Sequence, residues 1–95
     1  MGATNGKFLN FSTLSNSSSI NFGSILAAAS EDQTMALTGA VIGDVVMTGL
    51  PSDQDANLII EAFVSAVDTI TFRAHNVGAV TVDQAAKTYK ATIIR

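Results

Sequence analysis

Residues 57–75 constrain the fold most, because they alternate between apolar and other residues on both sides of a short turn. In residues 69–75, Ile70, Phe72 and Ala74 take one face, and Thr69, Thr71, Arg73 and His75 take the other. In residues 57–66, the apolar positions 58, 60, 62 and 64 repeat with period two, and several residues are β-formers. Ala and Glu in that segment also permit a helix. The simplest interpretation is a long hairpin that turns at Val67-Asp68.

From residue 20 onward, short runs of β-forming residues alternate with turn residues. Further strands are expected at 19–22, continuing after a kink at 25–26, and at 33–38, 45–48, 79–82 and 88–94. Glycines and the Leu50-Pro51 loop separate them. Turn signals recur about every 8–12 residues, which is typical of β-sandwiches and small barrels. The prediction is an all-β, jelly-roll-like small β-sandwich of about seven to eight short antiparallel strands.

The first part of the chain has a different composition. Residues 1–19 are rich in Asn, Ser and Gly, with Phe8, Leu9 and Phe11 between two polar stretches. One interpretation is a frayed terminus. We favour an extended N-terminal arm that orders on a neighbouring subunit, because the large apolar side chains would otherwise lie in water. The expected organisation is therefore an arm over 1–19 and a β-sandwich domain over 20–95.

Composition predicts that the chain needs protein partners. It has 95 residues, no cysteine and one histidine, so disulfides, thiolate metal sites and multi-histidine sites within one chain are excluded. Small domains without such staples commonly rely on oligomerisation. The chain is 47% hydrophobic and 14% charged, against roughly 25% charged residues in average domains. We therefore expect the chain to bury apolar surface in contacts with other protein chains.

Other partner classes are not expected. The five basic residues are scattered and the net charge is −3, which disfavours nucleic acid. There is no stretch of about 18 apolar residues for a membrane span, and no secretory signal is recognisable.

The sequence contains weak candidates for a catalytic or metal site. The run Asp53-Gln54-Asp55-Ala56-Asn57 resembles the opening of a calcium loop, but Leu58 and Val64 stand where an EF-hand needs Gly and Glu. A solvated acidic loop is the simpler interpretation, and an adventitious cation site the alternative. His75 lacks a recognisable nucleophile motif, and the glycines form no nucleotide-binding pattern. We therefore expect no enzymatic activity and no cofactor.

Threonine-rich stripes are the positive signal for binding. They comprise Thr34 with Thr38, Thr69 with Thr71, and Thr88 with Thr92. A threonine face with few charges suits packing against another polar protein surface, although β-propensity alone also explains it.

Several segments together resemble small virion proteins of tailed bacteriophages. The segments are 20–25, 31–34, Gly39-Ala40, 43–46 with Pro51, the hairpin 64–73 with Asn76, and Asp83 with 88–92. Related domains occur in head decoration (cement) proteins and in head or tail fibre proteins. The resemblance implies a β-sandwich that assembles as a homotrimer on the capsid exterior or in a fibre. The acidic loop 51–57 departs from this pattern.

The leading hypothesis is a decoration protein that binds the major capsid protein on the outside of the virion and stabilises the shell. In it, Phe8, Leu9 and Phe11 contact the capsid or an adjacent subunit. The alternatives are a fibre, tail or host-surface adhesion module of the virion, and a non-viral binding module or minor enzyme.

Overall fold

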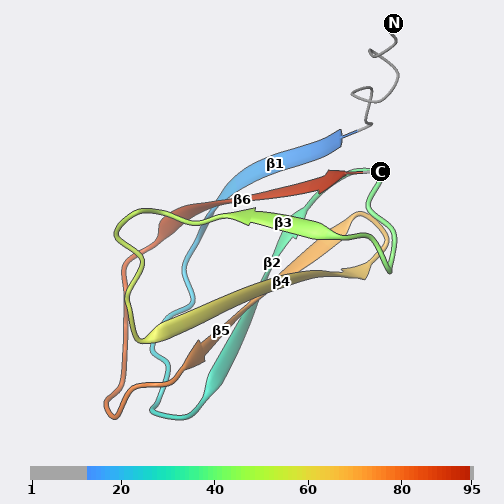
Figure 1. The fold of residues 1–95 in the computed structure, drawn as a ribbon. Coiled ribbons are helices and arrows are strands. Elements are labelled where there is room, and N and C mark those ends of the chain that lie inside the picture. The colour runs from blue at the N-terminus through green and yellow to red at the C-terminus, as the bar shows by residue number, and fades with distance from the viewer. Residues whose placement is uncertain (1–12, 95) are drawn as a thin grey trace, which may run out of the picture.

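The computed structural model describes residues 13–94, which form six antiparallel β-strands in two packed three-stranded sheets (Figure 1). The strands are β1 (Thr13–Ile20), β2 (Ser30–Ala36), β3 (Val46–Gly49), β4 (Leu58–Ala66), β5 (Thr69–Asn76) and β6 (Lys87–Ile94). The expected all-β, sandwich-like architecture is confirmed. The expected strand number is too high for this part of the chain, and six strands are two fewer than the eight of a jelly roll.

The strand order places late strands at the centre of both sheets. One sheet has the order β1-β6-β3 and the other β2-β5-β4. The sheets face each other with β1 near β2 and β3 near β4. The β4–β5 pair is therefore the one hairpin within a sheet among the described strands, and every other connection crosses between the layers.

The predicted hairpin is confirmed. β4 pairs with β5 from Leu58↔Asn76 to Ala66↔Thr69, with a bulge between Val64 and Ala66. The chain reverses at Val67-Asp68, where Asp68 has a φ of 61°. Aspartate tolerates this left-handed conformation better than most residues because its short side chain bonds locally. Here Asp68 Oδ1 accepts a hydrogen bond from Gly39 N at 2.7 Å, which ties the turn to the β2–β3 loop.

The core lies between the sheets on the faces that the alternation predicted. Ile70, Phe72 and Ala74 of β5 are completely buried, and so are the alternating residues 89, 91 and 93 of β6. The Tyr89 ring packs against Phe72 at 5.6 Å between centroids and edge-on against Phe22 at 5.8 Å. These aromatic contacts join the two sheets at the centre of the domain.

Two expected strands are instead reduced to one isolated bridge. Residues 25–26 and 79–82 pair only at Ile25↔Val82, which exchange both main-chain hydrogen bonds. The Asn76 side chain supplies further bonds beside this bridge. Its Nδ2 donates to Ile25 O at 2.9 Å and to Val80 O at 2.8 Å, and its Oδ1 accepts from Gly78 N at 2.9 Å. A buried side chain therefore joins these segments beside their single bridge.

Residues 13–19, which the sequence placed in the arm, form most of β1. The strand runs antiparallel to β6 from Thr13↔Ile94 to Ile20↔Lys87. Its Ser/Asn-rich sequence has little β-propensity of its own, so pairing with the well-packed β6 decides its structure. Phe8, Leu9 and Phe11 lie outside the described residues.

Candidate functional site

The outer face of the β2-β5-β4 sheet carries a chain of polar contacts centred on His75. Ser30 Oγ lies 2.6 Å from His75 Nδ1, and Glu61 Oε1 lies 3.2 Å from His75 Nε2. The strand register produces this row, since Ser30 in β2 stands opposite His75, and Glu61 in β4 stands opposite Arg73, two residue pairs along the same face. The sequence predicted His75 beside Arg73 on this face, but the partners on β2 and β4 were missed.

Arg73 forms the strongest pair on the same face. Its Nε and Nη2 donate to Asp32 Oδ1 and Oδ2 at 2.8 and 2.9 Å, a bidentate geometry that fixes the guanidinium plane. The same hydrogen bonds lower the pKa of Asp32 below its usual value. The guanidinium also lies 5.1 Å from the centroid of the Phe63 ring, within cation–π range.

The Ser30–His75–Glu61 row resembles a nucleophile, base and acid, but its surroundings differ from a hydrolase site. The side chains of His75 and Glu61 are 37% and 54% exposed on a sheet face. The main-chain groups of β5 are committed to β2 on one side and β4 on the other, so they do not supply oxyanion donors. The arrangement provides a rigid polar surface suited to contact with another molecule.

The threonine stripes lie on both outer faces of the sandwich. Thr34 stands opposite Thr71 on the β2-β5-β4 sheet, and Thr71 Oγ1 donates to Ser65 Oγ at 2.6 Å. Thr92 lies on the other sheet opposite Ser15, and their hydroxyl oxygens are 3.2 Å apart. The stripes therefore do not form one continuous face.

The acidic loop is held by its own neighbours. Lys87 Nζ lies 2.9 Å from Asp53 Oδ2, and this hydrogen bond lowers the pKa of Asp53. Asp55 Oδ1 accepts from Asn57 N at 2.8 Å, which is a local turn. Residues 13–94 contain no group of three or more His, Cys, Asp or Glu side chains placed to hold a metal ion.

A buried polar cluster fastens this loop to the core. Tyr89 donates its hydroxyl to Gln54 Oε1 and accepts from Gln84 Nε2 at 2.7 Å. Gln54 Nε2 in turn donates to Gln84 Oε1 at 3.0 Å. Burial raises the pKa of Tyr89 above its usual value. The cluster stabilises one position of the loop that follows Pro51.

One end of the sandwich exposes a group of large apolar side chains. The β2–β3 loop and the β4–β5 turn meet there, joined by hydrogen bonds from Leu37 N to Asp68 O and from Asp68 N to Ala40 O (Figure 1). We call these exposed side chains the apolar end: Val41, Ile42, Val45 and Val67. Three of the four are about 70% exposed, at 71%, 72% and 69%. Ile94 and Met47 on the adjoining sheet face are exposed as well.

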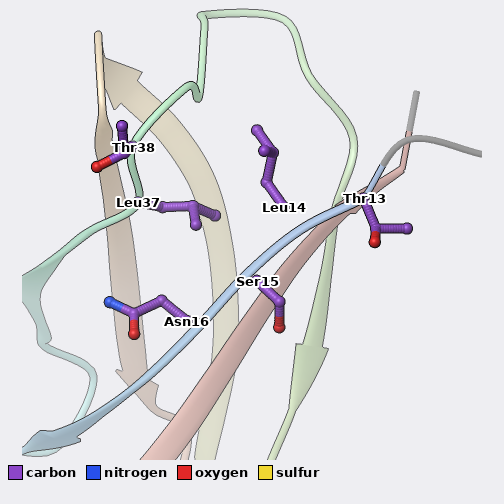
Figure 2. Close-up of a pocket in the computed structure, with 6 residues that line it drawn as sticks. All are labelled: Thr13, Leu14, Ser15, Asn16, Leu37 and Thr38. Atoms are coloured by element: carbon purple, nitrogen blue, oxygen red, sulfur yellow. The ribbon is translucent and has the colours of Figure 1, made fainter.

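A hollow of about 430 Å³ opens at the edge where β1 and β2 meet (Figure 2). It is lined by Thr13, Leu14, Ser15, Asn16, Leu37 and Thr38. Leu37 is buried and Leu14 partly buried, so the two leucines form an apolar floor. Asn16 Nδ2 donates to Ala36 O at 2.7 Å, and this hydrogen bond joins β1 to the end of β2 beside the hollow. This hollow could not be predicted from the sequence, because it depends on the spacing of two edge strands.

Within residues 13–94 no helix is long and apolar enough to cross a membrane. In comparisons with known proteins, no family model, no curated protein and no solved structure matches this chain.

Proposed function

We propose that this chain is a structural protein of a tailed-phage virion. In this proposal it binds the major capsid protein on the outer surface of the shell as a trimeric decoration protein, and its role is assembly and not catalysis. The resemblance in sequence suggests the class, and the apolar end is the structural observation that supports it best.

The apolar end supports the proposal because a small domain with so few charges gains by covering it. Large side chains that are about 70% exposed retain most of their apolar surface in water. Burial of apolar surface contributes about 25 cal/mol per Å², and contiguous exposed patches are typical of interaction sites. A shell protein that bridges neighbouring capsid subunits uses this gain to resist their separation.

The rigidity of the domain supports the same role. The aromatic contacts of Tyr89 join the sheets, and the glutamine cluster fixes the loop after Pro51. A preorganised surface loses little entropy when it binds. The polar face around Arg73 and His75 is then available to surround an apolar contact with hydrogen-bonding groups.

The test is to measure where the protein is in purified virions and how many copies each contains. A copy number in the hundreds, on the shell exterior in images of intact particles, is the expected result. A few copies confined to the tail or fibres would replace the decoration role with the adhesion role. Absence from the particle would overturn both.

A second measurement tests the contact surface. The double variant Val41→Ser with Ile42→Ser should reduce occupancy on particles that lack the protein. Val77→Ser with Val80→Ser is the matched control, because these exposed valines follow the end of β5 that is away from the β4–β5 turn. Circular dichroism should show that both variants remain folded, because these positions are exposed. Unchanged occupancy for the double variant would exclude the apolar end as the capsid contact.

A further inference from the structure

The hollow lies beside a strand edge that is open to pairing. β1 is the outermost strand of its sheet and pairs with β6 alone among the described strands. Its main-chain N–H and C=O groups on the other side are therefore available to another chain, apart from Ser17 N, which donates to Asn16 Oδ1 at 2.9 Å. Natural edge strands usually carry charges, proline or bulges, or are very short, which prevents such pairing.

β1 lacks these protections, whereas the other three edges have them. Its eight residues include no charge and no proline, and its register with β6 is unbroken. By contrast, β2 carries Glu31 and Asp32, β3 has four residues, and β4 has Glu61 and a bulge. Of the four edges in residues 13–94, β1 is thus the one suited to accept an added strand.

The segment that precedes Thr13 has the composition that this site requires. An added strand presents alternate side chains to the same face, so residues 9 and 11 share one face and residues 8 and 10 the other. Leu9 and Phe11 are both apolar, while Asn10 is polar. The hollow is within the usual size range of binding pockets, about 300–1,000 Å³, and has a leucine floor to receive them.

A second copy is the better source of this segment. For a chain to lie beside its own β1, it must reverse just before Thr13, and tight hairpin turns favour Gly, Asn or Asp at their centre. Residues 11 and 12 are Phe and Ser, and the nearest Asn-Gly pair, Asn5-Gly6, is too far upstream to return residues 8–11 to β1. A segment from another copy meets no such constraint.

We propose that residues 8–11 of one copy add as a strand to the free edge of β1 in a second copy, with Leu9 and Phe11 in the hollow over Leu14 and Leu37. The proposal deepens the proposed function by naming the contact that holds the oligomer together. A contact between two different patches of the chain is head-to-tail, so it closes into a ring when the rotation between copies permits.

Engineered disulfides test this directly, because the chain has no cysteine of its own. Purified Phe11→Cys and Thr38→Cys chains are mixed, allowed to exchange and oxidised, and the products are separated without reductant. Thr38 lines the hollow and is exposed, so its substitution leaves the core intact. The expected result is a disulfide-linked pair of unlike chains, at least about tenfold more abundant than with Phe8→Cys, since docking raises the effective concentration.

The double variant, Phe11→Cys with Thr38→Cys, distinguishes the two sources of the segment. Disulfides between chains, ending in a closed covalent ring, are expected. Closure within one chain, at monomer mass, would overturn the proposal in favour of the chain's own segment. Equal linkage by Phe8→Cys, or none by Phe11→Cys, would overturn it as well.

Self-association of the unmodified protein provides a second measurement. Sedimentation at micromolar concentration should show that the full chain forms an oligomer, and that Leu9→Ser with Phe11→Ser weakens association at least about tenfold while Phe8→Ser does not. Equal association by all three would overturn the proposal. These experiments need no virion, so their outcome is separate from the copy number and location that test the proposed function.

Discussion

Asn76 makes the most demanding structural prediction, because one buried side chain joins two segments that pair at a single bridge. Only 1% of the residue is exposed. Its amide donates to Ile25 O and Val80 O and accepts from Gly78 N, with all three distances between 2.8 and 2.9 Å. Asn76→Ala removes three hydrogen bonds. Ile25 O keeps the bond that it accepts from Val82 N at 3.0 Å, whereas Val80 O and Gly78 N lose the partner that Asn76 supplies.

The expected loss is about 3 kcal/mol, from about 1 kcal/mol net for each hydrogen bond. A domain of this size has a total stability of about 5–14 kcal/mol, so the change is large. In a thermal melt it corresponds to a drop of about 12–24 °C, at about 4–8 °C for each kcal/mol. Urea denaturation followed by far-ultraviolet circular dichroism gives the free energy of unfolding directly.

Two further variants make the test specific. Asn21→Ala is the matched control, because Asn21 is exposed and accepts one hydrogen bond from Gly23 N at 2.9 Å. Asn76→Asp keeps the shape but removes the amide donors, so at neutral pH it should cost at least as much as Asn76→Ala. If Asn76→Ala costs no more than the control, or if Asn76→Asp preserves wild-type stability, the Asn76 hydrogen bonds do not stabilise the domain.

Three other predictions follow from the buried tyrosine, the acidic loop and the hairpin turn. Tyr89→Phe should cost about 1–3 kcal/mol in urea denaturation, because its two glutamine partners stay largely buried without the hydroxyl; an unchanged midpoint would contradict this. The lowered pKa of Asp53 means that its pairing with Lys87 favours folding above the unfolded pKa near 3.8 and is lost as pH falls through the folded value; NMR titration should show Lys87→Met raising the Asp53 pKa. Asp68→Ala loses both the Gly39 hydrogen bond and a side chain that tolerates positive φ, so it should cost about 1–2 kcal/mol more than Asp68→Asn, by the same urea assay.

The parts of the fold that could be predicted from the sequence are those with local causes. The β4–β5 hairpin follows from alternation within each strand and a short turn, and the buried faces of β5 and β6 follow from the same period. β1 could not be found this way, because its serines and asparagine show no apolar period. Its structure depends on β6, and the hydrogen bond between Ser15 and Thr92 joins residues 77 positions apart.

The same distinction between local causes and long-range pairing applies to the candidate sites. Alternation alone placed His75 and Arg73 on one face, since both belong to β5. The pairing of His75 with Ser30 and Glu61, and of Arg73 with Asp32, needed the register between strands, which residues in one strand do not specify. The sequence signal that was available is the presence of acidic residues in the two strands that flank β5, which itself carries Arg and His. The hollow had no such signal.

The strand order also determines when each part of the domain is able to fold. During synthesis the β4–β5 hairpin is the first in-sheet pair whose strands have both emerged, and β2 is already available to dock on it. β1 has to wait for β6, so it stays unpaired while most of the chain is made. Long-range pairing of this kind slows folding, and unpaired strands promote aggregation. We therefore expect that refolding yield falls with protein concentration, and that a chain truncated before Lys87 keeps the β2-β5-β4 layer better than β1.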